Sequence, residues 1–386
     1  MREIEEDSPR SAGTPRISRT GWLGAIIIAS ACAFAGYFSP PFTLVKPRDT
    51  KPPSDVLETA YVGNDVCARC HTEQATRYQQ TGHAHTLHTR HICDHIAALK
   101  DHDIPDPERK GRFRFECNNG ELYVRYLSED GDVALPIQFA VGSGKHAVTF
   151  LTLIAGVDGE PAAIEHRLSV FKQGTTTGLT PSHAGLPITT PMDCLGRTKH
   201  GRDVTTCISC HSTTGQIHGT RVDDLRAGVG CESCHGPGRR HVTAIEAGLK
   251  QTSIEFMARH RTADEELHLC GRCHRSTEAL RVIPDPDDPK LARFQPVGLS
   301  QSACYQRSSG ALRCSTCHDP HQSVEQAAGT FNAHCQNCHG ASSSRTQISC
   351  TVQPGGDCTS CHMPAVEVHP GIRFHDHWIR RRKDRD

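Results

Sequence analysis

The pentapeptide Cys-x-x-Cys-His occurs seven times in this chain of 386 residues. Each copy places two thiols three positions apart and an imidazole directly after the second thiol. Two thiols at this spacing can add to the vinyl groups of one porphyrin while the imidazole binds its iron, so the pattern predicts seven covalent c-type haems. The predicted haem-binding residues are Cys67, Cys70, His71, Cys207, Cys210, His211, Cys231, Cys234, His235, Cys270, Cys273, His274, Cys314, Cys317, His318, Cys335, Cys338, His339, Cys358, Cys361 and His362.

Two other uses of paired cysteines fit this pattern less well. Structural zinc sites combine two Cys-x-x-Cys knuckles, or one knuckle with two histidines. Zinc does not require a histidine after every second cysteine, and seven knuckles do not pair evenly. A thioredoxin-like redox site uses a single motif near a βαβ pattern. The repeated histidine therefore favours haem.

The supply of histidine predicts how the irons are coordinated on their second face. The chain has 26 histidines and four methionines, and subtracting the seven motif histidines leaves 19 histidines. Most six-coordinate irons should therefore have two histidine ligands, which gives lower potentials than His/Met coordination. The candidate distal ligands are His83, His146, His241, His321 and His377, with His375 as a rival and His183, His200, His218 and His334 as weaker candidates.

The composition predicts a fold that depends on its cofactors. Hydrophobic residues make up 36% and aromatic residues 5%, which is little for the core of a chain this long. Packed porphyrins can supply the missing apolar volume, so we expect a mostly α and irregular polypeptide wrapped around haems. One small β-hairpin region is predicted around 111–156, where apolar and polar residues alternate on both sides of Asn119 and Gly120. The formal net charge of zero gives no reason to expect nucleic acid as a partner.

One apolar run, Gly21 to Ser39, has a length between that of a signal peptide and that of a membrane span. Arg16 and Arg19 precede it and place the N-terminus in the cytoplasm. We therefore expect an N-terminal signal or anchor helix, with the body of the protein on the periplasmic side of the membrane. The predicted divisions are a leader (1–20), a signal anchor or cleaved signal (21–39), a Pro-rich tether (40–59), a first haem segment (60–110), a β-containing insert (111–200) and a six-haem region (201–380).

Six cysteines lie outside the motifs, and Cys32 among them belongs to the apolar run. In an oxidising compartment the others can form disulfides. Position along the chain suggests Cys93 with Cys117 and Cys304 with Cys350, which would leave Cys194 unpaired. The sequence does not determine this connectivity.

Several motifs, taken with their neighbours, resemble a known family, the multihaem cytochromes related to cytochrome c-554. The resemblance covers about residues 60–380, is strong at the motifs and weak between them, and implies electron transfer through haems with two histidine ligands in stacked pairs. This chain departs from that tetrahaem family in having seven motifs. The segments that carry the resemblance are YVGNDVCARCH, TGHAHTL, GVGCESCHGPG, CSTCHDPH, CTSCHMP and FHDHWI.

Two functions follow from these patterns. The first is a seven-haem electron carrier of an extracytoplasmic respiratory chain, with redox proteins or a membrane quinol-oxidising complex as partners. The alternative is a multihaem oxidoreductase that acts on a small nitrogen or sulfur compound at a haem with an open distal position. The sequence assigns no catalytic residue to that alternative.

Overall fold

A computed structural model describes most of the chain after Thr59. The expected leader, anchor helix and tether (1–59) lie outside the described residues. Among the helices that are described, none is long and apolar enough to cross a membrane. The described residues are 60–96, 99–100, 102–171, 176–249, 254, 261–276, 285, 287–340, 350 and 356–382.

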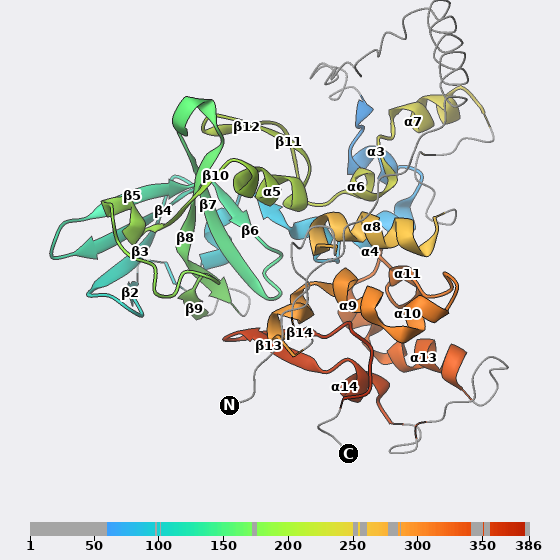
Figure 1. The fold of residues 1–386 in the computed structure, drawn as a ribbon. Helices are drawn as coiled ribbons and strands as arrows, with labels where there is room; N and C mark the ends of the chain where they lie inside the picture. The colour runs from blue at the N-terminus through green and yellow to red at the C-terminus, as the bar shows by residue number, and fades with distance from the viewer. Residues whose placement is uncertain are drawn as a thin grey trace, which may run out of the picture. The chain divides into compact units, whose positions relative to one another are not determined.

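Two antiparallel sheets dominate the first half of this region (Figure 1). The larger sheet has the spatial order β1 (Leu87–His88), β6 (Phe139–Val141), β7 (Ala147–Ile154), β8 (Ala162–Phe171) and β10 (Gly196–His200), with β9 (Thr176–Leu179) paired to β8. The smaller sheet has the order β2 (Asp103–Pro105), β3 (Gly111–Asn118), β4 (Glu121–Ser128) and β5 (Val133–Ile137).

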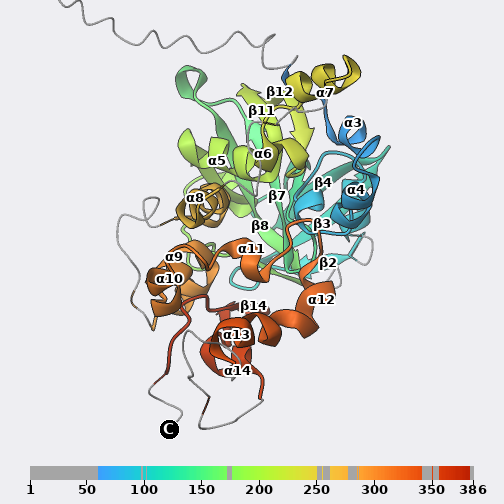
Figure 2. The ribbon, with the colours of Figure 1, turned by 90° about the vertical axis from the view of Figure 1, so that its right-hand side faces the viewer.

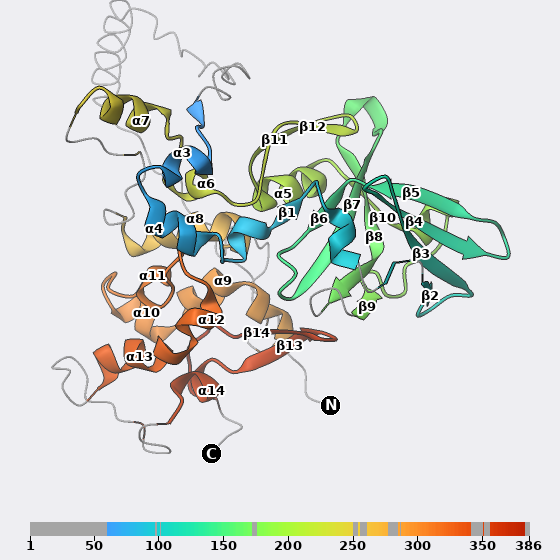
Figure 3. The ribbon, with the colours of Figure 1, turned by 180° about the vertical axis from the view of Figure 1, so that it is seen from behind.

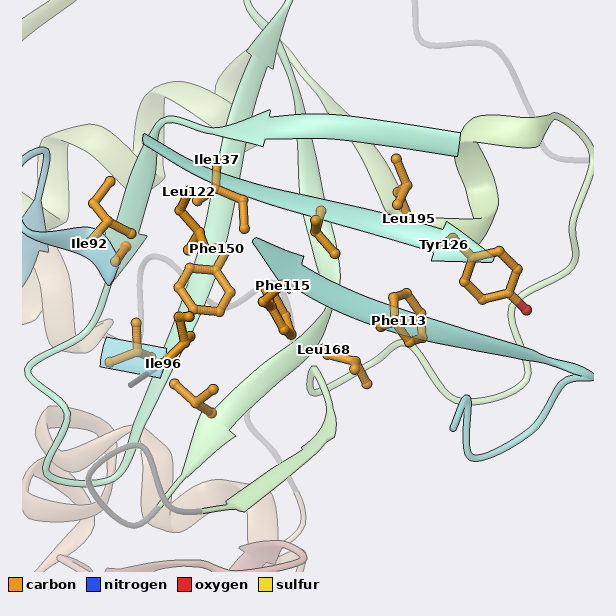
Figure 4. Packing of buried hydrophobic residues seen from close by; sticks show 14 residues of the cluster. Ile92, Ile96, Phe113, Phe115, Leu122, Tyr126, Ile137, Phe150, Leu168 and Leu195 are labelled. Carbon is orange, nitrogen blue, oxygen red and sulfur yellow. The ribbon is translucent and has the colours of Figure 1, made fainter. Parts of the chain in front are cut away.

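The alternation of apolar residues explains how the two sheets pack. Successive side chains of a strand point to opposite faces, so Phe113 and Phe115 of β3 are both buried and Arg114 between them is not. They join a core cluster that takes Phe150 from β7 and Leu168 from β8 (Figure 4). The β3–β4 hairpin turns at Asn119 and Gly120, which both have positive φ, as the Asn-Gly dipeptide predicts.

The other face of the larger sheet carries helix α5 (Arg202–His211). Val204 and Ile208 of this helix are fully buried and pack with Leu151 and Leu153 of β7. The second Cys-x-x-Cys-His motif forms the C-terminal end of α5. The sheet therefore positions this motif.

The remaining motifs lie on short helices joined by loops. Helices α9–α14 gather in a region separate from strands β2–β10, as views from opposite sides agree (Figures 1 and 3). The hairpin β11–β12 (Ser212–His218 and Arg221–Ala227) packs beside α6 (Figure 2). The other helices and strands are α3 (Asn64–Ala68), α4 (Thr72–Tyr78), α6 (Cys231–His235), α7 (Arg239–Glu246), α8 (Ala263–His274), α9 (Gln295–Gln301), α10 (Ala303–Arg307), α11 (Cys314–Cys317), α12 (Val324–Ala327), α13 (Phe331–His339), α14 (Cys358–His362), β13 (Ala365–His369) and β14 (Ile372–His375).

The expectation of a mostly α and irregular fold with one small β-hairpin region is wrong. Among the residues that the structure describes, strands account for 29% and helices for 37%. The β-region also continues beyond 111–156 into β8, β9 and β10 and has a core of its own. The low overall aromatic content hid this core, because seven of the chain's 20 Phe, Trp and Tyr residues lie in the 90 residues 111–200, a higher density than the whole-chain average suggests.

A disulfide joins Cys93 to Cys117, which confirms one of the two pairings that the sequence suggested. It links the 3₁₀ helix Ile92–Ile96 to the end of β3 beside the core. Cys304 and Cys194 are free thiols, so the suggested bridge between Cys304 and Cys350 is not formed.

Candidate haem attachment sites and the contacts between them

Helical geometry brings the three functional groups of most motifs together. In α5, α6, α8, α13 and α14 the helix contains both cysteines and ends at the motif histidine. The cysteines are then at positions i and i+3 and the histidine at i+4, and residues at these spacings share one helix face. In the first motif α3 ends at Ala68, before Cys70, and His71 directly precedes α4. None of the fourteen motif cysteines is fully buried.

Local capping explains where these short helices begin and end. The helix of the fourth motif, α8, starts with a capping box, in which the Glu265 N–H donates to Thr262 Oγ1 at 3.2 Å and the Thr262 N–H donates to Glu265 Oε2 at 2.7 Å. The helix of the third motif, α6, stops at Gly236, whose φ of 80° suits a glycine. The helix of the seventh motif, α14, is capped by Asp357, which accepts the Thr359 N–H at 3.0 Å.

The first and third motifs are held against each other although about 160 residues separate them. Asn64 Oδ1 accepts the Cys231 N–H at 2.9 Å. The buried carboxylate of Glu232 accepts three backbone N–H groups, from Val62 at 2.9 Å, Gly63 at 2.8 Å and Gly238 at 2.7 Å. A buried carboxylate needs such donors to replace its lost hydration. Glu232 is therefore the main polar link between these two motifs.

Two further pairs of motifs use the same kind of link. Asn332, on the helix of the sixth motif, accepts the Cys358 N–H of the seventh motif at 3.0 Å. Glu266, on the helix of the fourth motif, accepts the N–H of Ser315 at 2.6 Å and its hydroxyl at 2.9 Å, and Ser315 lies inside the fifth motif. In each pair, a side chain from the helix of one motif satisfies the first turn of the other.

Contacts between cysteines join the same pairs of motifs. The first cysteines of the first and third motifs share a hydrogen bond, and this bond from Cys67 lowers the pKa of the Cys231 thiol to about 7. The first cysteines of the fourth and fifth motifs, Cys270 and Cys314, are hydrogen-bonded in the same way. Cys335 of the sixth motif interacts with the first cysteine of the seventh. The motifs are thus paired as first with third, fourth with fifth, and sixth with seventh.

The second motif is joined differently. Its second cysteine, Cys210, is hydrogen-bonded by Cys273, the second cysteine of the fourth motif, which lowers the Cys210 pKa to about 6. His211 directs Nδ1 to the carbonyl oxygen of Thr86 at 3.1 Å. A hydrogen bond of this kind fixes the ring of a metal-binding histidine and leaves Nε2 for the metal.

Four motif histidines each face a second histidine, and the distance between the two ring centres is nearly the same in all four pairs. The ring centres are 6.4 Å apart for His71 and His241, 5.9 Å for His274 and His83, 6.0 Å for His235 and His321, and 6.1 Å for His318 and His377. Imidazole binds a first-row metal at about 2 Å, so rings on opposite sides of one iron have centres about 6 Å apart. These side chains therefore fit haem between them. His83, His241, His321 and His377 are four of the five predicted distal candidates.

The electrostatics of these histidines suit metal binding. Burial lowers the pKa of His83 to about 4, and the facing His274 adds to the shift. Burial also lowers the pKa of His377 to about 4. A neutral imidazole is the form that binds a metal ion.

The fifth candidate, His146, lies elsewhere, with its ring centre 4.9 Å from that of Phe374. None of the ring contacts between described residues involves His211, His339 or His362. The rival His375 directs Nδ1 to the Met363 carbonyl. Among the weaker candidates His183 pairs with Glu165, His218 lies 3.8 Å from Asp223, His334 lies near His318, and His200 ends β10.

The side chains that join one motif to another were not predicted from the sequence. For two of them, a sequence pattern was nevertheless present. These side chains are Asn64, Glu232, Glu266 and Asn332. The pattern Asn-x-x-Cys-x-x-Cys-His occurs in the first and sixth motifs only. Both asparagines, Asn64 and Asn332, bond the first cysteine of a partner motif. The carboxylates of Glu232 and Glu266 carry no comparable signal, because acidic residues are usually exposed.

Comparison with known proteins relates part of this chain to a family of cytochromes. The family described as cytochrome c554 and c-prime matches residues 66–119 and 190–236, which include the first three motifs. The chain is a multihaem c-type cytochrome. Its haem c is covalently bound, as the family implies.

Two further similarities concern larger or more distant proteins. The dissimilatory sulfite reductase MccA of Wolinella succinogenes is 25% identical over 206 residues, which cover 43% of this cytochrome and 27% of that protein. The cytochrome thus matches about a quarter of the length of this curated relative. The crystal structure of the outer cell wall cytochrome OcwA covers 83% of this chain and 79% of its own at 14% identity, and its TM-score of 0.46 is too low to show a shared fold.

Proposed function

We propose that this cytochrome transfers electrons through seven covalent haems, most of them bound by two histidines. The facing imidazoles, with ring centres 5.9 to 6.4 Å apart, are the observation that carries the proposal. Bound haem supplies an iron that gains and loses one electron, and two histidine ligands keep its potential low and leave no position for a substrate.

Contacts between motifs support a continuous route through the protein. The three pairs of motifs are connected to one another as well. Arg272 of the fourth motif donates to the Ser233 carbonyl of the third at 2.7 Å. Cys317 of the fifth motif lies near Cys338 of the sixth. The fourth motif thus contacts the second, third and fifth, and its residues lie where the routes through the protein branch.

A second function, reduction or oxidation of a small sulfur compound, has one specific observation in its favour. His211 of the second motif, like His339 and His362, makes no ring contact with another histidine among the described residues, and Thr86 orients it for metal binding. The partial similarity to a protein named as a dissimilatory sulfite reductase points to the same class of substrate. Cations lie near one side of this motif, because the charges of Arg272 and Arg275 help to lower the pKa of the Cys210 thiol, whereas at Cys207 the charge of Lys199 is opposed by that of Glu165. Such charges favour a small oxyanion.

Electron paramagnetic resonance of the purified ferric protein, with haem measured by the pyridine haemochrome assay, tests both functions. The carrier function predicts seven haems per chain and low-spin signals for the pairs described above. A high-spin haem that is lost in Cys207→Ser/Cys210→Ser and that changes on adding sulfite supports the second function. Fewer than seven haems, or high-spin signals that survive in this variant, would contradict the assignment.

We further propose that the protein works outside the cytoplasm, on the periplasmic side, with a redox protein or a quinol-oxidising complex as its electron donor. The Cys93–Cys117 disulfide supports this location, because such bonds persist in oxidising compartments. Fractionation of cells, followed by haem staining, should find the protein in the periplasmic or membrane fraction. Haem-stained protein in the cytoplasmic fraction would contradict the proposal.

A further inference from the structure

Two buried carboxylates lie at the points where haem-binding motifs meet. Glu232 directly follows the first cysteine of the third motif and is 3% exposed. Glu266 lies one helical turn before the first cysteine of the fourth motif and is 7% exposed. The oxygens of both accept N–H and O–H donors, which stabilise an ionised carboxylate. Each side chain therefore places a negative charge inside the protein.

Each of these charges acts on the first cysteines of two motifs. The charge of Glu232 opposes deprotonation of Cys231 in the third motif and of Cys67 in the first. The charge of Glu266 opposes deprotonation of the first cysteines of the fourth and fifth motifs. These sulfurs are the expected attachment atoms for haem. Each carboxylate thus lies close to the attachment points of two haems.

The sixth and seventh motifs are joined by a neutral side chain instead. Asn332 Oδ1 accepts the Cys358 N–H at 3.0 Å, and its Nδ2 donates to the Gly356 carbonyl at 3.4 Å. Asp357 stands next to the same cysteine, but it is exposed, so water and salt screen its charge. The link between motifs is therefore charged in two pairs and uncharged in the third.

Other charged groups modify this difference without reversing its sign at the fifth motif. Arg261 and Arg272 favour deprotonation of the first cysteine of the fourth motif and offset part of the carboxylate charge there. Near the seventh motif, the Arg380 carbonyl lies 3.1 Å from Nδ1 of the motif histidine. The buried Asp376 is paired with Arg380 and Arg382, so this group carries no net negative charge.

We propose that Glu232 and Glu266 lower the reduction potentials of the haems at the motifs they join, and that electrons therefore pass from these motifs toward the sixth and seventh. This inference rests on the proposed attachment of haem at all seven motifs. A negative charge disfavours an added electron for the same reason that it disfavours a thiolate. One electron from the donor reduces one iron, and its passage to the next iron oxidises the first again. The final acceptor is a redox protein of higher potential that binds at the seventh motif.

The expected size of the effect follows from Coulomb's law. A unit charge roughly 10 Å from a redox centre in a partly buried site changes its reduction equilibrium about tenfold. For a one-electron couple, a tenfold change corresponds to about 59 mV. Removal of one buried carboxylate charge should therefore raise the potential of a neighbouring haem by this amount.

Spectroscopic redox titration of the haem-loaded protein tests the proposal. Glu266→Gln keeps an acceptor oxygen for the Ser315 N–H and removes the charge. It should raise one potential, that of the haem at the fifth motif, by about 59 mV and that of the fourth by less, also at high salt, because a buried charge is screened little. Glu265→Gln is the matched control, since it neutralises the neighbouring exposed carboxylate and glutamine also suits a capping box. It should leave the potentials unchanged.

The reverse substitution adds a charge where the protein has none. Asn332→Asp keeps the oxygen that accepts the Cys358 N–H and should lower the potentials of the haems at the sixth and seventh motifs about tenfold in equilibrium terms. The components are assigned by their loss in Cys314→Ser/Cys317→Ser for the fifth motif and in Cys358→Ser/Cys361→Ser for the seventh.

The outcomes separate the effect of the carboxylates, the direction of transfer and the attachment of haem. Unchanged potentials in Glu266→Gln, or equal shifts in Glu266→Gln and Glu265→Gln, would overturn the effect of the buried charge. A seventh haem that is reduced at a lower potential than the fifth would overturn the direction. If Cys314→Ser/Cys317→Ser lost no haem, the attachment itself would be wrong, whatever the potentials. A raised fifth potential in Glu266→Gln, together with loss of a higher-potential component in Cys358→Ser/Cys361→Ser, supports the whole proposal.

Discussion

Replacing Glu232 tests whether one carboxylate holds the first and third motifs together. Its side chain is 3% exposed and accepts three backbone N–H groups. A hydrogen bond to a charged group contributes about 1.5–3 kcal/mol, so three set an upper bound of roughly 5–9 kcal/mol. Bonds that share one acceptor are not additive, and partly exposed N–H groups regain some hydration from water. We expect Glu232→Ala to lower the free energy of unfolding by about 3–4 kcal/mol.

The conservative variant gives an intermediate result that depends on the geometry. In Glu232→Gln, the amide oxygen can replace Oε1 and still accept from Val62 and Gly238. The amide nitrogen then replaces Oε2 and faces the Gly63 N–H, so two donors oppose each other. We expect a loss of about 1.5–3 kcal/mol, which is the value of one charge-assisted bond.

Urea unfolding of the haem-loaded protein, followed by circular dichroism, measures these differences as shifts of the midpoint at an unchanged slope. Glu246→Ala on the exposed side of α7 is the control and should change stability by no more than about 0.5 kcal/mol. If Glu232→Ala unfolded at the same urea concentration as Glu246→Ala, the link between the two motifs would have no energetic importance.

Three further predictions concern other parts of the protein. His377→Ala should convert one low-spin ferric haem to high spin, whereas His375→Ala should not. Identical electron paramagnetic resonance spectra for the two variants would refute the assignment of His377 as a haem ligand. Replacing Cys93 and Cys117 by serine should lower stability by about 3 kcal/mol, because the bond closes a loop of 24 residues, and an unchanged urea midpoint would contradict this. Burial lowers the pKa of His166 to about 3. The neutral, buried ring of His166 therefore stabilises the fold fully above about pH 6.5, and this stabilisation is lost as pH falls toward 3. His166→Gln should lessen the acid-induced loss of stability between pH 6 and 4, and an equal loss in both proteins would count against the argument.

The chemistry of the haem sites was accessible from the sequence because it is local. A thiol, two residues, a second thiol and an imidazole lie within one helix in five of the seven motifs, so Cys231 to His235 needs no distant partner to present its groups. The excess of histidine over methionine likewise limits the second ligand by supply alone. The hairpin at Asn119 and Gly120 is equally local, because those two residues readily adopt positive φ.

The fold class was mispredicted because whole-chain composition averages over unequal segments. The aromatic residues at Phe113, Phe115 and Phe150 build a conventional core in one segment, while the motif regions have few such residues. Composition therefore suggested a chain without a substantial sheet.

Tertiary structure alone decided which motifs meet and which histidines face each other. Nothing in the sequence around His83 shows that it faces His274 rather than the motif twelve residues before it. Such contacts depend on loop paths and on buried links such as Glu232, whose partners are backbone groups far away in the chain. The contacts of Glu165 with His183 and Lys199 have the same origin, since two strands and one loop must pack before these side chains touch. The sequence by itself determined what each site can bind, and packing decided how the sites are connected.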